Sequence, residues 1–467
     1  MRSTLSLAAA FGCLFFGGCT VPADPPPIAP SDLPDAFSTS GNLKSGPQWW
    51  LAFEDAGLNR AVETALASNL SLQATWERLS QARAAARKSA AARYPDLSLS
   101  GGASNAENRG TSDGSSQSFS AGLAAGYEVD LWGGIAATAE AAALDADASE
   151  AALRTAALSL SAEVATLWYR LQGAQMQYTL LQRQRKINEN YLALTERKFR
   201  SAQARASDVL QQRQSLEAVN GNIVTAQNDI TLYEHQLAVL MGQLPGNLAY
   251  EPLPGFTPLP PLPATGVPST LLAERPDVKA AFYDLQAADR RVAAAVAERY
   301  PQLSFSASLQ SSALRAADLF EAWVLNLAAN LSAPLIDGGA RRAEVARTEA
   351  VRNEALYTYA QTLLEAFREV EDALSEREHQ LRYVESLDAQ LALSAAAVEQ
   401  LRSQYLHGSG SFEAFLSAQL SHQSLERTRV TAARELREKQ ITLYRALSTG
   451  WDPQRQKPMQ RSADAGN

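Results

Sequence analysis

The chain has 467 residues, enough for two or three ordinary domains or for one very elongated domain. Its net charge is −8 and it carries no stripe of basic residues, so its composition excludes a typical nucleic-acid-binding protein. Ala, Leu, Gln, Ser, Arg and Glu dominate, whereas there are only 4 His, 4 Met and 2 Cys, which favours long helices.

The N-terminus is typical of an export signal. Arg2 precedes an apolar run over 5–16, which is too short to span a membrane as a helix. The run ends in "FFGGC", which resembles the lipobox of bacterial lipoproteins. Residues 1–18 are therefore predicted to be a lipoprotein signal peptide.

The cysteine of this motif, Cys19, is the predicted lipidation site. Cys13 would be removed with the signal peptide, so no disulfide framework is expected. Phe16 stands where lipoboxes usually have Leu, and plain secretion remains the alternative. Thr20 rather than Asp follows the cysteine, which by resemblance to lipoprotein sorting signals favours the outer membrane. Residues 19–48 are rich in proline and are interpreted as a lipidated tether followed by an equatorial segment.

A duplication organises the rest of the chain. "RYPDLSLS" at 93–100 returns as "RYPQLSFS" at 299–306. The shift that carries Arg93 onto Arg299, here called the repeat offset, brings further residues into register in the same order. The duplication predicts a first repeat (49–242), a proline-rich equatorial linker (243–268), a second repeat (269–450) and a C-terminal tail (451–467).

Each "RYP" is predicted to end a helix and begin a β-hairpin. Helical patterns cover about 55–93 and 269–299, and a proline ends each one because it lacks the N–H and clashes with the preceding turn. Apolar and small or polar residues then alternate, which predicts two hairpins, over 95–132 and 301–336.

These hairpins fit two architectures. A small sandwich packed on helices is one, because it also alternates apolar and polar residues. A transmembrane barrel is the other, and the export signal favours it. Four strands cannot close a barrel, since the smallest have about eight, so subunits must share one: eight strands from two copies or twelve from three.

Long helices connect the hairpins. Residues 135–200 and 340–406 have the three- and four-residue spacing of a coiled coil, interrupted in the first repeat at Arg185 and Asn188. Each of these helices would be roughly 100 Å long at ~1.5 Å per residue. Helices over about 208–242 and 412–448 return half of that distance.

The chain resembles the TolC-type outer-membrane factors, specifically the NodT family of efflux-system outer-membrane lipoproteins. The resemblance covers nearly the whole mature chain. It depends on the motifs "WWLAFEDAGLNRAVETALASN" (49–69), "RYPDLSLSGG" (93–102), "YEVDLWGG" (127–134), "ERPDVKAA" (274–281), "RYPQLSFSAS" (299–308), "APLIDGG" (333–339) and "REVEDAL" (368–374).

This resemblance implies a homotrimer with a mixed fold. Three copies would form a twelve-stranded transmembrane β-barrel in the outer membrane and a periplasmic α-helical barrel, or tunnel, of long coiled-coil helices. It implies the exit duct of a tripartite efflux pump, with a periplasmic adaptor and an inner-membrane transporter of the RND type as partners. Outer-membrane lipid would surround it, and neither a cofactor nor a nucleic-acid partner is expected.

The sequence offers no catalytic or metal-binding constellation. The four histidines lack ligand spacing and are interpreted as solvent-facing: His235, His379, His407 and His422. "GSGSF" (408–412) lacks the final glycine of a nucleophile elbow and is interpreted as a turn between helices. "EVED" (369–372) is interpreted as a hydrated helix face. An enzyme is therefore not expected.

In this family the turns between the long helices form the periplasmic entrance. The resemblance places the tip turns at Ala202, Gly408 and Gly410, and Asp208 and Glu413 are the candidate entrance, or gate, residues. Three copies of each carboxylate would attract cations. The second hairpin departs from TolC itself, which has aspartates where Ala414 and Ser417 stand here. Stabilisation of the helix N-terminus is an equally good explanation of Asp208.

A second function remains open from the residues alone. A structural coiled-coil lipoprotein or adaptor could bridge the envelope layers without conducting anything. Such a protein would not need four amphipathic strands of membrane-spanning length, so the strands favour the duct.

Overall fold

The computed structural model describes residues 34–42, 46, 48–108, 114–246 and 255–447. Within them the chain forms two compact units. The first comprises Ala85–Leu144 and Leu285–Ala360. The second comprises the described parts of Asp32–Ala84, Asp145–Asp284 and Gln361–Asn467. No helix in the described ranges is both long and apolar enough to cross a lipid bilayer.

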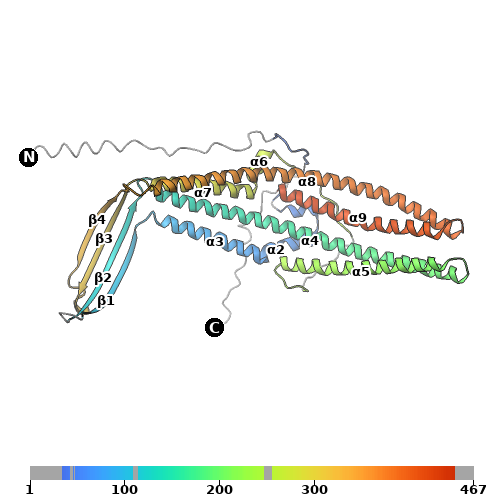
Figure 1. Ribbon diagram of the computed structural model, residues 1–467, viewed down its shortest axis with the longest axis horizontal. Coiled ribbons are helices and arrows are strands. Elements are labelled where there is room, and N and C mark those ends of the chain that lie inside the picture. Colours follow the sequence, from blue (N-terminus) through green and yellow to red (C-terminus); the bar gives the residue numbers. More distant parts are fainter. Residues whose placement is uncertain (1–33, 43–45, 47, 109–113, 247–254, 448–467) are drawn as a thin grey trace, which may run out of the picture. The chain divides into compact units, whose positions relative to one another are not determined.

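The elements repeat in order, as Figure 1 shows. The first repeat contains η1 (Trp49–Phe53), α2 (Ala56–Ser68), α3 (Leu70–Ala91), β1 (Asp96–Asn108), β2 (Gly114–Val129), α4 (Gly134–Arg200) and α5 (Ala206–Leu240). The second contains α6 (Pro268–Glu274), α7 (Pro276–Ala297), β3 (Gln302–Ala313), η2 (Ala316–Asp318), β4 (Val324–Ser332), α8 (Ala340–Leu406) and α9 (Phe412–Leu447). The repeat offset carries both ends of α3 and α4 onto the ends of α7 and α8, so the duplication extends to the element boundaries.

The first unit contains one antiparallel sheet in the order β1-β2-β3-β4. Each hairpin is formed by neighbouring strands, and β2 joins the hairpins by pairing with β3. Within the described residues, β1 and β4 each have one edge without a partner strand. The sheet is therefore open on both sides.

The helix expected over 55–93 is instead two helices, α2 and α3, and the expected 269–299 helix is likewise α6 and α7. Asn69 lies at the first break, where its Oδ1 accepts from the N–H of Leu72 (2.9 Å) and its Nδ2 donates to the carbonyl of Leu240 (2.9 Å). The interruption supplies a donor to the C-terminal end of α5, whose last carbonyls have no partner within the helix.

Arg275 occupies the equivalent break in the second repeat. Its side chain is 7% exposed and donates to the carbonyls of Ala446 (3.2 Å) and Ala366 (3.4 Å). It also pairs with Asp277 (2.5 Å) and Glu369 (2.9 Å). Burial alone would lower the pKa of Arg275, but these two carboxylates outweigh it and raise the pKa.

The main core of the second unit contains a cluster of aromatic side chains. Trp49, on the short helix η1, stacks on Tyr444 with 5.8 Å between ring centroids, and its Nε1 donates to Ser161 Oγ (3.1 Å). The buried carboxylate of Asp55 begins α2 by accepting from the backbone N–H of Leu58 (3.0 Å), and it also accepts from Trp168 Nε1 (2.9 Å). The "WWLAF" motif therefore anchors the start of the first repeat to α4 and α9.

Candidate functional site

The strand register separates the sheet into two faces. Leu99 lies opposite Leu123, and Leu123 lies opposite Leu309. The neighbouring residues Ser98, Ala124 and Ser308 are opposite one another in the same way. Because side chains alternate between the faces of a sheet, one face is mostly apolar over all four strands, apart from polar residues such as Asn105 and Glu107 near the first hairpin turn, and the other is small or polar.

The apolar face is open to solvent in the single chain. Large exposed residues on it include Leu97 (73%), Leu99 (79%), Leu325 (63%), Leu327 (74%) and Leu331 (71%). A soluble sandwich would cover such a face, whereas a transmembrane sheet presents it to lipid. The register thus gives the sheet the two faces that a barrel wall requires.

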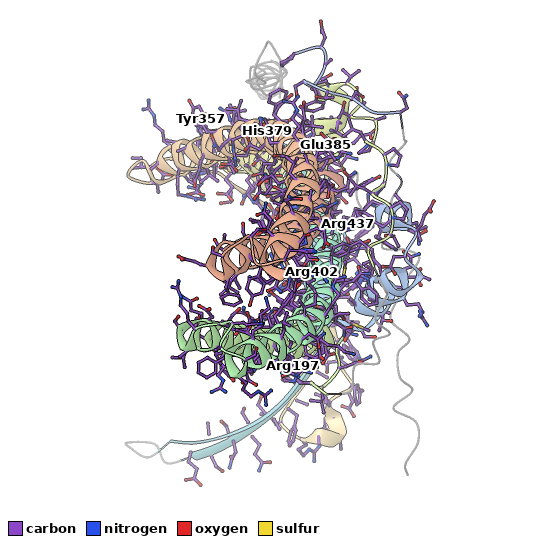
Figure 2. All side chains as sticks on the ribbon, turned by 90° about the vertical axis from the view of Figure 1, so that its right-hand side faces the viewer. Arg197, Tyr357, His379, Glu385, Arg402 and Arg437 are labelled. Carbon is purple, nitrogen blue, oxygen red and sulfur yellow. The ribbon has the colours of Figure 1, made fainter. Side chains whose placement is uncertain are left out.

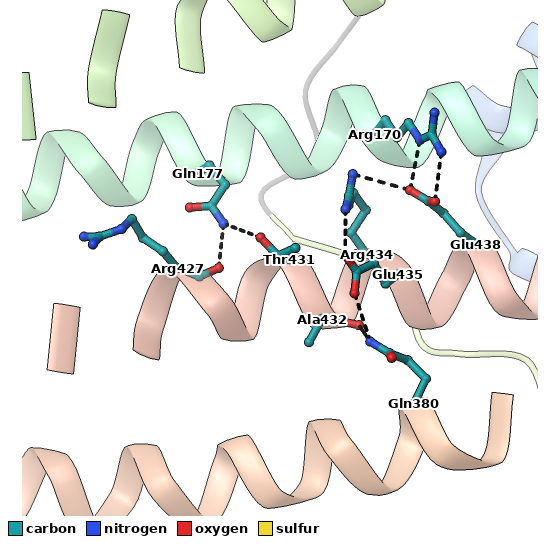
Figure 3. A network of polar contacts seen from close by, with 9 residues as sticks. All are labelled: Arg170, Gln177, Gln380, Arg427, Thr431, Ala432, Arg434, Glu435 and Glu438. Atoms are coloured by element: carbon teal, nitrogen blue, oxygen red, sulfur yellow. Dashed lines mark hydrogen bonds and ion pairs between the residues drawn. The ribbon is translucent and has the colours of Figure 1, made fainter. Parts of the chain in front are cut away.

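In the second unit, α4 contacts both α5 and α9. Figure 2 shows the α8–α9 pair above the α4–α5 pair, with Arg437 on α9 and Arg197 near the end of α4. Arg170 of α4 forms two hydrogen bonds to Glu438 of α9, both 3.2 Å, and Gln177 donates to the carbonyl of Arg427 (2.6 Å), as drawn in Figure 3. The contact between the two repeats is therefore polar along this length.

Asn188 is the centre of a buried polar cluster. It is fully buried and donates to Gln423 Oε1 of α9 (3.2 Å), while its own Oδ1 accepts from Gln212 (3.1 Å) and Ser215 (3.3 Å) of α5. The interruption of the apolar spacing at this residue was visible in the sequence, but its three-helix contacts were not. A buried Asn that is paired on both sides fixes the register of neighbouring helices.

The first tip turn closes α4 at Ala202. This residue has a left-handed backbone (φ 58°), its N–H donates to the Phe199 carbonyl (3.0 Å), and the N–H of Gln203 donates to the Lys198 carbonyl (2.7 Å). These two bonds form a Schellman motif, which usually has glycine at the left-handed position. Ala202 therefore adopts a conformation that its Cβ disfavours.

The second tip turn repeats this motif with glycine. Gly408 has φ 77°, and the bonds Gly408 N–H to Tyr405 O (3.3 Å) and Ser409 N–H to Gln404 O (2.9 Å) match those of the first turn. Gly410 is at a close approach, since a Cβ there would lie 2.9 Å from the Cβ of Gln404. Glycine is thus favoured at both second-turn positions, for different reasons.

Asp208 lies in the first turn of α5 and stabilises it. Its Oδ2 accepts from the backbone N–H of Arg205 (3.0 Å), and its Oδ1 accepts from Ser207 Oγ (3.3 Å). This is the carboxylate half of a capping box, and the negative charge also suits the helix N-terminus. The structure therefore supports the capping explanation of this residue.

Glu413 lies in the first turn of α9 and is exposed. There the cap is Ser411, whose Oγ accepts from the N–H of Ala414 (3.1 Å). Within the described residues, no hydrogen bond or ion pair connects Glu413 to Asp208. Phe415 is buried against Tyr405, so it packs within the hairpin.

Three of the histidines, His235, His379 and His407, are exposed as expected. The fourth differs: His422 is half-buried, with its Nε2 4.0 Å from Glu426 Oε1 on the next helical turn. No group of three or more His, Cys, Asp or Glu side chains in the described ranges could hold a metal ion. Cys19 lies outside the described residues.

Sequence reasoning also missed Arg437, which holds the proline-rich linker. It donates to the carbonyl of Thr257, and its guanidinium lies 4.2 Å from the ring centroid of Phe256. Burial lowers the pKa of Arg437 to about 10. No local pattern marks this residue, because its two partners in the linker lie in a segment far away in the chain.

Known proteins match this architecture over nearly its whole length. The pyoverdine export outer membrane protein OpmQ of Pseudomonas aeruginosa is 32% identical, covering 97% of this chain and 98% of that protein. The probable outer membrane lipoprotein SilC of Salmonella typhimurium is 25% identical, covering 96% and 98%. The solved structure of the outer-membrane channel OprN superposes with a TM-score of 0.81 at 27% identity, covering 90% and 99%.

These matches agree with the geometry of the sheet and the helices. The fold is that of channels with a helical tunnel and a β-barrel, and the protein is located in the outer membrane. The outer membrane efflux protein family model matches twice, over residues 61–243 and 267–449. The chain therefore belongs to the outer membrane efflux protein family and is not an enzyme but an exit duct of tripartite efflux pumps, which work with an adaptor and an inner-membrane transporter.

Proposed function

We propose that three copies of this chain form the duct, as a homotrimer with a closed twelve-stranded barrel. The observation that carries this proposal is the open four-stranded sheet, which has an apolar face and, within the described residues, two edges that lack a partner strand. Unpaired strand edges are not tolerated in the hydrocarbon region of a membrane, so other copies must complete the barrel.

The strand number favours three copies over two. A barrel of about eight strands has an interior that side chains fill, and it would leave little space for a solute. Twelve strands enclose a wider lumen, which the polar face of the sheet would line. The trimer is therefore the smallest assembly suited to conduction.

The mass of the assembly and its conductance test this proposal together. We expect detergent-purified protein to have the mass of three chains by light scattering and to form channels in planar bilayers. A monomer or dimer without conductance would overturn the proposal and favour a structural coiled-coil lipoprotein. The OprN channel, prepared in the same way, is a suitable positive control.

We also propose that the inner-membrane partner is of the RND type and that the cargo is a small solute. The names of the relatives support the small cargo: pyoverdine export for OpmQ and cation efflux for CusC. The RND type follows from the resemblance to the NodT family. Co-purification of the tagged chain with the adaptor and transporter encoded beside it tests the partner. Co-purification with a transporter of another class would contradict the RND assignment.

Cys19 is proposed to carry the lipid. The barrel already anchors the protein, so acyl chains would contribute to targeting more than to retention. We expect wild type, but not Cys19→Ser, to incorporate labelled palmitate. With an ordinary cleavable signal peptide, Cys19→Ser should still give folded trimers. Failure of that variant to assemble would contradict this division of roles.

The tip turns are proposed to form the periplasmic entrance, with Asp208 and Glu413 as its acidic residues. The exposure of Glu413 supports this role, while the capping bonds of Asp208 give that residue a structural role as well.

A further inference from the structure

A three-helix pocket lies where α5 and α9 end beside α4. Its volume is about 750 Å³, and residues within 159–170, 235–240 and 441–445 line it, all of them in the second unit. Pockets that bind small molecules have volumes of roughly 300–1,000 Å³. None of its described lining residues belongs to the tip turns or to the sheet, so the pocket is a separate feature of the helices.

The pocket and the aromatic core lie on opposite sides of α4. Ser161 and Trp168 face the core, where each forms a hydrogen bond to the segment 49–55. Glu163 follows Ser161 by two residues, Thr166 precedes Trp168 by two, and both line the pocket. Two residues turn a helix by about 200°, so these pocket side chains point away from the core. In the proposed duct, η1 and α2 cover the core side of this wall, and the pocket opens on the other side, toward the tunnel.

The pocket contains two opposite charges that are not paired. Nearby, Arg170 of α4 donates to Glu438 of α9 (3.2 Å), as Figure 3 shows. Glu163 lies seven residues before Arg170, and Arg445 lies seven residues after Glu438. Because α4 and α9 are antiparallel and seven residues make almost two turns, these positions lie about 10 Å further along the helices, with the charges exchanged. Both are exposed, and neither side chain forms a hydrogen bond or ion pair with another described residue.

Apolar side chains lie beside the unpaired charges. Leu167 of α4 and Ile441 of α9 come between the two levels of charge and are buried. Val239 of α5 lines the same pocket and is 58% exposed. An apolar group in contact with Val239 would remove this surface from water, which is favourable. The pocket therefore offers an apolar surface next to one carboxylate and one guanidinium.

We infer that the three-helix pocket binds zwitterionic solutes that have an apolar body. The ammonium group of such a solute would pair with Glu163, its carboxylate with Arg445, and its apolar body would cover Val239. A solute with a single charge leaves one of the two charged side chains without a partner. This inference rests on the proposed small-solute duct and adds the chemical class that the duct wall binds. The binding must be weak enough to let the solute leave, because a duct conducts only what it releases.

Three fluorescent probes with the same dansyl group test the charge requirement. Nε-dansyl-lysine is a zwitterion, dansylglycine carries only the carboxylate, and dansylcadaverine carries only the ammonium group. Dansyl fluorescence rises in an apolar environment, so titration of the full protein in lipid nanodiscs, with empty nanodiscs as the blank, measures each dissociation constant. We expect the zwitterion to bind about tenfold more tightly than either singly charged probe, because a hydrogen bond to a charged group contributes at least that factor.

Each charge is tested by its own substitution. Glu163→Gln should weaken the binding of the zwitterion and of dansylcadaverine about tenfold and leave dansylglycine unchanged. Arg445→Gln should weaken the zwitterion and dansylglycine by a similar factor and leave dansylcadaverine unchanged. Val239→Asn should weaken the binding of all three probes. Glu385→Gln and Arg200→Gln remove exposed charges outside the pocket and should change none of the dissociation constants.

The outcomes separate the pocket from the duct. Equal affinities of the three probes, a preference that Glu163→Gln and Arg445→Gln both leave unchanged, or the absence of saturable binding would overturn the inference. If one charge variant fails to fold by circular dichroism, the wild-type probe series and the other variant still decide. The conductance of the same wild-type preparation is recorded in planar bilayers. Normal conductance without a preference for the zwitterion overturns only the pocket, whereas a protein without conductance overturns the proposed duct.

Discussion

The two repeats interrupt their first helix at equivalent positions, yet they hold the interruption with different chemistry. Asn69 uses neutral hydrogen bonds, whereas Arg275 uses a buried cation with two carboxylates. Both donate to the same kind of acceptor, the carbonyls of Leu240 and Ala446, which are themselves equivalent positions of the two repeats. Both repeats therefore have a side-chain donor for the carbonyls at the end of a helix, because those carbonyls have no partner within the helix. The residue that supplies the donor differs between the repeats.

The largest expected effect on stability comes from substitutions at these two helix breaks. Arg275→Met should lower the free energy of unfolding by about 3–5 kcal/mol, because it leaves two carbonyls and two carboxylates without their partner. Asn69→Ala should cost about 1–2 kcal/mol, the loss of a helix cap and one hydrogen bond. Urea titrations followed by tryptophan fluorescence measure both. If both variants lose the same free energy of unfolding, the charge of Arg275 contributes no stability beyond that of a neutral hydrogen-bond donor.

The pH dependence of Arg275→Met sharpens the same comparison. Burial opposes ionisation of Asp277, but bonds from Arg275 outweigh it and hold the pKa below 3.8. This contribution to stability is complete above pH 3.8 and is lost as the pH falls through the lowered value. The stability gap between wild type and Arg275→Met should therefore narrow below pH 3.8. If the stability difference between wild type and Arg275→Met stays constant as the pH falls below 3.8, the Arg275–Asp277 ion pair is not the source of that difference.

The two faces of the sheet form a second contrast. Leu123→Arg puts a charge on the apolar face and should cost about 2–4 kcal/mol if the residue lies near the bilayer midplane. Ala124→Arg puts it on the opposite face and should be milder while altering conductance. The amount of assembled protein in outer-membrane fractions and single-channel recordings measure the two effects. Equal losses of assembled protein would mean that the faces are assigned wrongly.

The two tip turns should respond to mutation in opposite directions. Gly408→Ala forces a Cβ into the left-handed region and should destabilise by roughly 1 kcal/mol, whereas Ala202→Gly should relieve a similar strain. A Cβ at Gly408 would meet no atom within 4 Å, so backbone strain is the only cause. Thermal melting of the two variants, each compared with wild type, measures the difference. Destabilisation by both substitutions would contradict the shared motif.

The smallest effect on stability, and the most specific effect on transport, is expected at the entrance. Asp208→Asn with Glu413→Gln should lower cation selectivity at low salt with only a small effect on stability, because the exposed charge of Glu413 contributes little to folding and Asn at position 208 can still accept the capping bond. Reversal potentials across a salt gradient measure selectivity, with the exposed Glu349→Gln as control. An unchanged potential would remove both residues from the gate and direct attention to the exposed Gln211.

Much of this fold was predictable because its signals are local. The alternation in "RYPDLSLS" and "RYPQLSFS" predicts strands, and the prolines mark where the helices end. The tip turns at Ala202 and Gly408 were located from the ends of the helical pattern and the resemblance. Stabilisation of the helix N-terminus by the charge of Asp208 was anticipated as an alternative to the entrance role, but its capping bond to Arg205 was not.

The sequence by itself determined the duplication, the two hairpins and the long helices, because periodicity and proline act over a few residues. Only the tertiary structure decided the breaks at Asn69 and Arg275, since the carbonyls of Leu240 and Ala446 that they satisfy come from distant helices. The same holds for Asn188, which appeared in the sequence only as a gap in an apolar pattern. The role of a polar residue in such a gap depends on its hydrogen-bond partners, and the partners of Asn188 come together only when α4, α5 and α9 pack.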